Sequence, residues 1–233
     1  MRTAATLLAA SLLCALTAPL PARAGDVLQD KCAACHALDK PTGDGLDHVT
    51  GRKGPDLHYA GSKFKRDWLV DWLQKPETIR PGGAYFAKAV TPGMPRDVID
   101  PAKLPKHPAL SKADAEAAAA ALMAKTAPDL IPPGGATGEK PNERMAQMSF
   151  GKLRGCSACH QATAGEGGLS GPELHSAGRR LQPDFIAAYI RDPQKIDPKV
   201  WMPSVAITEA DVQKLTGWLS QRGVQPAPEG AKP

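Results

Sequence analysis

The segments Cys32-Ala33-Ala34-Cys35-His36 and Cys156-Ser157-Ala158-Cys159-His160 carry the same pattern, Cys-x-x-Cys-His, once in each half of the chain. Two thiols at this spacing can add to the two vinyl groups of one haem, and the histidine that follows is placed to bind the iron. The pattern therefore predicts two haem c groups, each held by two thioether bonds. The predicted attachment residues are Cys32, Cys35, Cys156 and Cys159, and the predicted iron ligands are His36 and His160.

Two other uses of a Cys-x-x-Cys pair have to be weighed. The two pairs together could supply four thiolates to a zinc ion, and each pair alone could act as a thioredoxin-like redox couple. Neither use gives a role to the histidine that follows each pair, and neither explains why the whole pattern occurs twice. Haem attachment is therefore the favoured interpretation.

The N-terminal segment has the features of a secretory leader. Arg2 provides a positive charge, residues 4–18 form an apolar run, and Ala22-Arg23-Ala24 fits a cleavage site. Residues 1–24 are thus predicted to be a cleaved signal peptide and the mature protein to be periplasmic. Cys14 is not preceded by a small residue, so no lipid anchor is expected. Beyond the leader no apolar run approaches the roughly 18 to 20 residues that span a bilayer, so no membrane span is expected.

Charge and cysteine usage narrow the classes of partner. The 233-residue chain carries 29 Lys and Arg against 24 Asp and Glu, a formal net charge of +5. The basic residues are interleaved with acidic ones and form no stripe, so nucleic-acid binding is not expected. The propionates of two haems would lower this net charge. Every cysteine other than Cys14 belongs to a motif, which leaves no thiol for a structural disulfide.

An internal repeat extends the match between the halves. Gly54-Pro55-Asp56-Leu57-His58 aligns with Gly171-Pro172-Glu173-Leu174-His175, and Met94-Pro95 aligns with Met202-Pro203. The repeat predicts two domains, joined by a linker rich in Pro and Gly and followed by a flexible tail. The predicted boundaries are 25–126 for the first domain, 127–142 for the linker, 143–225 for the second domain and 226–233 for the tail.

Helical periodicity dominates both halves. The segment 64–75 places its large apolar residues on one helical face before Pro76, and 184–191 repeats this arrangement. Ser111 and Thr208 stand where they would cap a later helix in each half. Strand signals are nearly absent, so an all-α fold is predicted. A domain this small and this poor in aromatic residues needs the haem to complete its core.

Met94 and Met202 occupy equivalent positions in proline-flanked loops. A thioether ligand favours ferrous iron, raises the reduction potential and closes the sixth coordination position to small molecules. We therefore predict Met94 and Met202 as the second axial ligands; the alternative is that each only fills space beside the porphyrin. Two closed iron centres indicate an electron carrier and not an enzyme.

The prolines after each motif have a predicted supporting role. The carbonyl groups of Pro55 and Pro172 follow the glycine of each Gly-Pro turn and are expected to accept the ring N–H of His36 and His160. Such a hydrogen bond fixes the tautomer and the orientation of an imidazole that binds a metal.

Four further histidines are weighed against simpler roles. His58 and His175 recur in both copies and could compete as distal ligands, but a place at the propionates or the solvent edge is favoured. His48 and His107 have no counterpart in the other copy and are interpreted as loop histidines.

Basic residues gather just after the two Gly-Pro turns. They are Lys63, Lys65 and Arg66 in the first half and Arg179 and Arg180 in the second. They are candidates for docking an acidic redox partner by charge, and the alternative is a solvated helix start.

Taken together, these motifs resemble those of a known protein family. Each half is similar to a class I cytochrome c, and the pair resembles the periplasmic dihaem cytochromes c of bacteria over nearly all of the mature chain. The second half, with Gly171-Pro172-Glu173-Leu174, Arg191-Asp192-Pro193 and Met202-Pro203, also resembles cytochrome domains fused to some terminal-oxidase subunits and the small haem subunit of thiosulfate-oxidising complexes. The resemblance implies electron transfer and an all-α fold of two tandem class I cytochrome c domains, each wrapped around a covalently bound haem c.

Three functions follow as hypotheses. The first is a dihaem shuttle between a periplasmic donor and an acceptor such as an oxidase or reductase. The second is the cytochrome subunit of a multisubunit oxidoreductase, in complex with a catalytic subunit. The third is a dihaem enzyme such as a peroxidase, which two methionine ligands and the lack of a spare cysteine disfavour.

Overall fold

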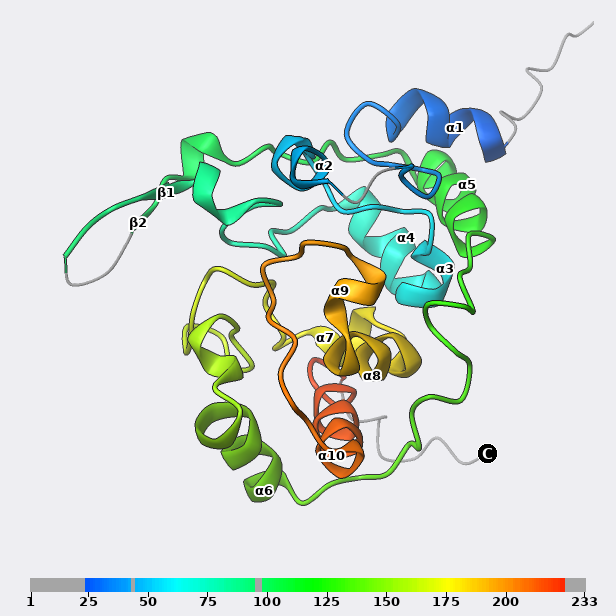
Figure 1. Ribbon diagram of the computed structural model, residues 1–233. Helices are drawn as coiled ribbons and strands as arrows, with labels where there is room; N and C mark the ends of the chain where they lie inside the picture. The colour runs from blue at the N-terminus through cyan, green and yellow to red at the C-terminus, as the bar shows by residue number, and fades with distance from the viewer. Residues whose placement is uncertain (1–23, 43–44, 95–97, 225–233) are drawn as a thin grey trace, which may run out of the picture.

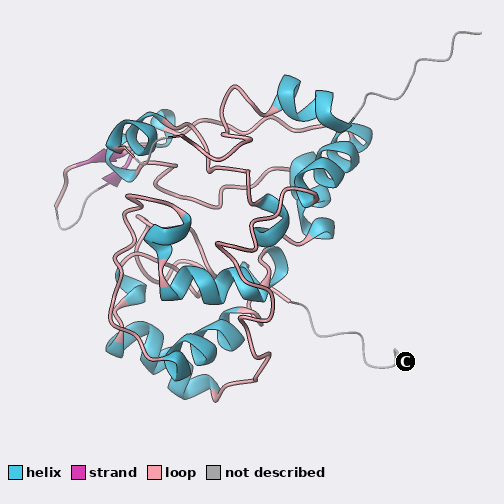
Figure 2. Ribbon diagram, turned by 45° about the vertical axis from the view of Figure 1, so that its right-hand side comes forward, coloured by secondary structure: helices cyan, strands magenta, loops and turns pink. Residues whose placement is uncertain are grey.

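The computed structural model describes residues 24–42, 45–94 and 98–224. All but the last residue of the predicted signal peptide (1–24), and the whole predicted C-terminal tail (226–233), lie outside the described residues. Helices dominate the described part of the chain, and regular strands there are limited to one short hairpin (Figures 1 and 2). The elements of the first half are α1 (Ala24–Lys31), α2 (Leu46–Gly51), α3 (Ala60–Lys63), α4 (Arg66–Gln74), β1 (Val90–Thr91), β2 (Val98–Ile99) and α5 (Lys112–Met123), with 3-10 turns at Phe86–Lys88 and Pro101–Lys103. Those of the second half are α6 (Glu143–Met148), α7 (Ala177–Arg180), α8 (Pro183–Arg191), α9 (Pro193–Ile196) and α10 (Glu209–Leu219), with a π-helical turn at Ser149–Leu153 and a 3-10 turn at Cys156–Ala158.

The first half is built around α5, which packs against α1, α3 and α4. Helix α4 buries Trp68, Leu69 and Leu73, the face expected from the sequence, and its last residue comes just before Lys75 and Pro76. The hydroxyl of Ser111 accepts a hydrogen bond of 3.1 Å from the Asp114 N–H and so caps α5. Helix α5 buries Ala115, Ala118 and Ala119 completely, so small side chains form most of its packed face.

The second half repeats this arrangement with α10 packed against α8 and α6. Helix α8 begins with Pro183 in its first turn and buries Phe185 and Ile186. The hydroxyl of Thr208 accepts from the Asp211 N–H at 3.2 Å, as Ser111 does in the first half. The cap residues predicted from the sequence are confirmed in both helices.

The same close approach of backbone segments occurs in both halves. A Cβ atom on Gly61 would come within 2.2 Å of the Met123 carbonyl oxygen at the end of α5, and a Cβ atom on Gly178 would come within 2.1 Å of the Ser220 carbonyl oxygen after α10. The repeat aligns Gly61 with Gly178. Both positions therefore require glycine for the same reason, which is contact with the C-terminal end of the last helix.

The two halves meet around a local twofold axis. Phe64 and Leu181, which the repeat makes equivalent, form an isolated antiparallel bridge. Hydrogen bonds of 2.9 Å on either side of this bridge run from the Lys65 N–H to the Arg180 carbonyl and from the Gln182 N–H to the Lys63 carbonyl. The repeat also relates Lys63 to Arg180 and Lys65 to Gln182. The halves thus associate as two copies of one unit do in a symmetric dimer.

The predicted linker is pinned to the second half. The carboxylate of Asp184 accepts hydrogen bonds from the N–H groups of Gly134 and Ala136, at 3.0 and 2.9 Å. Arg191 donates to the Gly135 carbonyl at 2.8 Å. Ile131 is buried. The segment has no helix or strand within the described residues, as predicted, but it is held in one place by α8.

The β1–β2 hairpin is a departure from the sequence-based expectation. Val90 pairs with Ile99 and Thr91 with Val98, in antiparallel register. The hairpin extends away from the helices of the first half (Figures 1 and 2). The strands are so short that they carry no alternating pattern longer than two residues, which is why the sequence did not reveal them.

None of the described helices has the length and apolar character needed to cross a membrane.

Candidate haem-binding sites

The first motif positions His36 against the Gly-Pro turn. The ring Nδ1 of His36 lies 2.7 Å from the Pro55 carbonyl oxygen, so Nδ1 carries the proton and donates it. A Cβ atom on Gly54 would lie 2.4 Å from Cε1 of the same ring. The N–H of Leu57 donates to the Ala37 carbonyl at 2.8 Å and ties the turn to the motif. The ring therefore has one fixed orientation, and Nε2 makes no hydrogen bond to the described residues.

The second motif has the same geometry. Nδ1 of His160 donates to the Pro172 carbonyl at 2.8 Å, and a Cβ atom on Gly171 would lie 2.5 Å from Cε1 of His160. The N–H of Leu174 donates to the Gln161 carbonyl at 2.7 Å. The hydrogen bonds predicted for Pro55 and Pro172 are thus present in both halves. In each half they leave Nε2 as the nitrogen with a free lone pair.

Burial favours the neutral form of both imidazoles. Desolvation lowers the pKa of His36 and of His160, and the hydrogen bond to the proline carbonyl opposes this effect only in part. A metal ligand must present an unprotonated nitrogen. Both rings meet that condition at neutral pH.

The thiols of the two motifs are unpaired. Cys32, Cys35, Cys156 and Cys159 form no disulfide. Burial is the main cause that raises the pKa of Cys32 and of Cys156, the first cysteine of each motif. In thioredoxin-like pairs the reactive thiol has a lowered pKa, so this environment does not suit thiol–disulfide exchange.

The zinc alternative also lacks support from the geometry. Among the described residues no group of three or more His, Cys, Asp and Glu side chains converges as a metal site. The two Cys-x-x-Cys pairs therefore do not come together. Each half instead presents two free thiols followed by one neutral imidazole, which is the donor set that a haem c requires.

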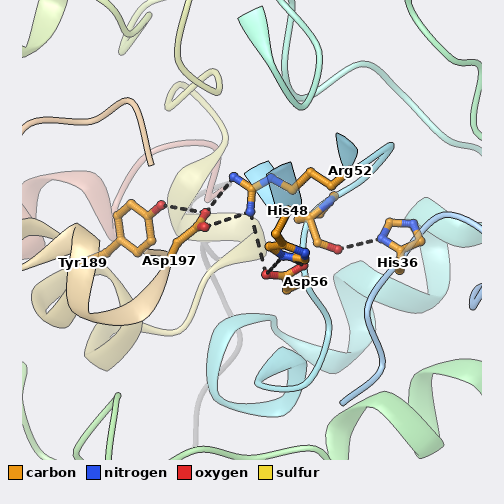
Figure 3. A network of polar contacts seen from close by, with 7 residues as sticks. His36, His48, Arg52, Asp56, Tyr189 and Asp197 are labelled. Carbon is orange, nitrogen blue, oxygen red and sulfur yellow. Dashed lines mark hydrogen bonds and ion pairs between the residues drawn. The ribbon is translucent and has the colours of Figure 1, made fainter. Parts of the chain in front are cut away.

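A buried polar network joins the first site to the second half of the chain (Figure 3). Arg52, just after α2, binds Asp197 through two hydrogen bonds of 2.7 and 3.1 Å, and both side chains are about 5% exposed. Asp56, the residue after Pro55, lies 3.7 Å from Arg52 and accepts from Nε2 of His48 at 3.1 Å. The residue that follows the carbonyl group orienting His36 is thus linked, through Arg52, to Asp197 at the C-terminal end of α9.

The predicted docking residues lie mostly at the twofold contact between the two halves and not on an open surface. Lys63 and Arg180 are buried, at 8% and 3% exposure. Lys63 lies over the rings of Tyr59 and Phe64, at 5.5 and 5.0 Å, and burial lowers its pKa to about 7. Arg180 binds Glu173.

Lys65 also belongs to the interface, since its ammonium donates to the Gly178 carbonyl at 2.6 Å. Arg66 and Arg179 remain exposed. The prediction of a five-residue docking cluster is therefore wrong. Three of its members hold the two halves together, because the twofold contact falls on these residues in both copies.

The two predicted methionine ligands lie in different environments. Met202 is partly buried in the loop before α10. Met94 lies between β1 and β2 with 94% of its surface exposed, so almost nothing packs against it. The structure does not bring Met94 into contact with His36.

The histidines that recur in both copies contact other groups. His58 packs edge-on against Tyr59, and its buried Nδ1 has no hydrogen-bond partner among the described residues. It lines a cavity of about 260 Å³ with Leu38, Asp39 and Lys125. His175 lies 3.3 Å from Glu173 and is 40% exposed.

Sequence reasoning missed Arg52, Asp197 and His107. The first two come from opposite halves, and nothing in the repeat relates them. His107, interpreted as a loop residue, lies close to His36, with ring centres 6.2 Å apart. Its only signal in the sequence was its place between two prolines, Pro105 and Pro108.

Comparison of the chain with protein-family models, curated proteins and solved structures finds no match.

Proposed function

We propose that this protein is a periplasmic dihaem c-type cytochrome that transfers electrons between protein partners. The observation that carries the proposal is the geometry around the His36 ring, which recurs around the His160 ring. In each half a Cys-x-x-Cys-His histidine donates Nδ1 to a proline carbonyl, faces a glycine that leaves room for the ring, and keeps Nε2 free. That combination serves an imidazole that binds a metal through Nε2.

The residues of the chain have distinct roles in this proposal. Bound haem supplies a one-electron couple at its iron. Cys32 and Cys35, like their counterparts in the second half, hold the group covalently. Pro55 and Pro172 fix the tautomer of the proximal imidazoles.

The proposal makes the protein a carrier and not an enzyme. A second axial ligand at each iron, with Met94 and Met202 as the sequence-based candidates, would close the sixth position to small molecules. Redox proteins of the periplasm are then the partners, reached through exposed haem edges.

A second candidate function is the cytochrome subunit of a larger oxidoreductase. It is favoured by apolar side chains exposed around Met202, since Trp201 is 72% exposed and Val205 43%. Leu153, 62% exposed, belongs to the same region because its neighbour Arg154 donates to the Ala206 carbonyl at 3.0 Å. Exposed apolar surface of this kind is typical of contact with another protein.

Carbon monoxide binding to the reduced protein tests the proposal. A carrier with both irons closed shows the absorption spectrum of two low-spin haems and no change on addition of carbon monoxide. Rapid binding of carbon monoxide at either haem would contradict the proposal of an electron carrier and would favour an enzyme. Copurification with a catalytic subunit from periplasm, lost when Trp201 is replaced by serine, would decide for the second candidate.

A further inference from the structure

We propose that His107, and not Met94, is the second axial ligand of the first haem. This inference rests on the proposed function, because it assigns a ligand to a haem that the Cys32–His36 motif would attach. It gives the two haems different ligand sets, with two imidazoles in the first half and an imidazole and a thioether in the second.

The spacing of the two rings is the first support. The ring centres of His36 and His107 are 6.2 Å apart. A metal–imidazole bond is about 2 Å long and the ring centre lies about 1 Å beyond the bound nitrogen, so two imidazoles on opposite sides of one metal have centres about 6 Å apart. The angle of 55° between the ring planes is compatible, because each ring can turn about its metal–nitrogen bond.

The hydrogen bonds of both rings select the same ligating atom. Nδ1 of His107 donates to the Pro108 carbonyl at 2.9 Å, as Nδ1 of His36 donates to Pro55. Nε2 of His107 makes no hydrogen bond to the described residues. Each ring therefore offers an Nε2 lone pair, with its tautomer fixed by a backbone carbonyl.

The segment that carries His107 is held against α4. The N–H of Leu110 donates to the Leu73 carbonyl at 2.8 Å. The ring of Trp72 lies 4.6 Å from the ring of His107, and Trp72 is itself fixed by a hydrogen bond of 3.0 Å to the Glu77 carbonyl. Pro105 and Pro108 restrict the backbone on either side. Packing against α4 thus positions His107 without the help of a bound metal.

The pair lacks further protein ligands. No third His, Cys, Asp or Glu completes a metal site with His36 and His107 within the described ranges. Two imidazoles without further protein ligands suit an ion whose other four ligands come from outside the protein, and a porphyrin supplies four nitrogens. His48, the other histidine nearby, is occupied by Asp56.

Met94 is a poor competitor for this position. It is 94% exposed, and it belongs to the hairpin that extends away from the helices (Figure 1). To reach His36 the hairpin would have to leave the position it has here, whereas His107 is already beside that ring.

The second half keeps its methionine. Aligning Leu110-Ser111 with Ile207-Thr208 places Ser204 at the position of His107, and a serine does not replace an imidazole as an iron ligand. Because a methionine ligand raises the reduction potential, the second haem should be the more easily reduced of the two. Electrons would therefore pass from the first haem to the second.

The test uses the full mature protein with both haems attached, examined by electron paramagnetic resonance and near-infrared magnetic circular dichroism in the ferric state. The wild type is expected to show one bis-imidazole haem and one imidazole–thioether haem. Met94→Ala should leave both signals unchanged. His107→Ala should convert only the bis-imidazole haem to a form that is high-spin when ferric and binds carbon monoxide when reduced.

Two further variants keep the outcome decisive. Met202→Ala should remove the thioether signal entirely, and His107→Met should raise the lower of the two reduction potentials. Two thioether signals in the wild type, or loss of one in Met94→Ala, would overturn the assignment of His107 while leaving the cytochrome proposal in place. Absence of covalent haem from the wild type would instead overturn the proposed function itself.

Discussion

At the scale of single residues, the positions of the His36 and His160 rings depend on glycines that the sequence indicated only as part of a turn. Nothing but hydrogen fits at Gly54 or Gly171, because the imidazole ring lies where a Cβ atom would be. The contact between each proline carbonyl and its histidine could be predicted from the motif, since the Gly-Pro turn follows it in both copies. The place of His107 could not, because it depends on how the segment after the hairpin packs on α4.

Replacing Gly54 by alanine tests this contact. The added methyl group would push the His36 ring from its position, and we expect a loss of about 1 to 3 kcal/mol in the free energy of unfolding. Gly51→Ala is the matched control, because nothing lies within 4 Å of a Cβ atom there. Urea unfolding of both variants gives the comparison; equal stability of Gly54→Ala and Gly51→Ala would show that the ring is not confined.

At the scale of elements, helix boundaries were predictable and the short hairpin was not. Proline, serine and threonine act through local backbone geometry, so the ends of α4 and the caps of α5 and α10 could be predicted from a few neighbouring residues. The two-residue strands depend on a pairing that no local pattern records. The linker has the composition of a flexible segment, yet hydrogen bonds to Asp184 hold it.

The N-terminus of α10 should make the second half sensitive to acid. Hydrogen bonds from Lys214, and next from Arg154, hold the pKa of Asp211 well below its usual range. A folded-state pKa below the unfolded value means stability that is present above the unfolded pKa, near 4, and lost as the pH falls below it. Asp211→Asn should therefore cost about 1 kcal/mol at pH 7 and progressively less in acid.

Asp114→Asn serves as the control for this prediction. Asp114 occupies the equivalent position at the start of α5, and its carboxylate makes no ion pair within the described part of the chain. Thermal unfolding between pH 7 and pH 2 should show a difference from wild type that shrinks with acid for Asp211→Asn alone. A difference that stays constant with pH would refute the role of the carboxylate.

At the scale of the whole molecule, the local twofold contact and the Arg52–Asp197 pair make the two halves one structure. One hydrophobic core contains residues from both, including the stacked rings of Tyr59 and Phe185. Duplication could be read from the sequence, but the way in which the copies meet could not. The contact between Arg52 and Asp197 joins residues 145 positions apart and has no equivalent in the repeat.

Removing one partner of this buried pair should be costly. Asp197→Asn leaves the buried Arg52 guanidinium with only the longer contact of 3.7 Å to Asp56, and we expect a loss of about 3 kcal/mol in stability. Glu116→Gln, in the exposed pair with Lys112, should change stability by no more than about 0.5 kcal/mol. Guanidinium unfolding, followed by circular dichroism, measures both effects. Similar values for the two variants would argue that the interface is not held by Arg52.

Intact-mass spectrometry of protein exported by a bacterium that attaches haem c is the most direct test of the central claim. The account predicts a mass equal to the mature polypeptide plus two haem groups, falling to one group when Cys32 and Cys35 are both replaced by alanine. A mass equal to the bare polypeptide would contradict it.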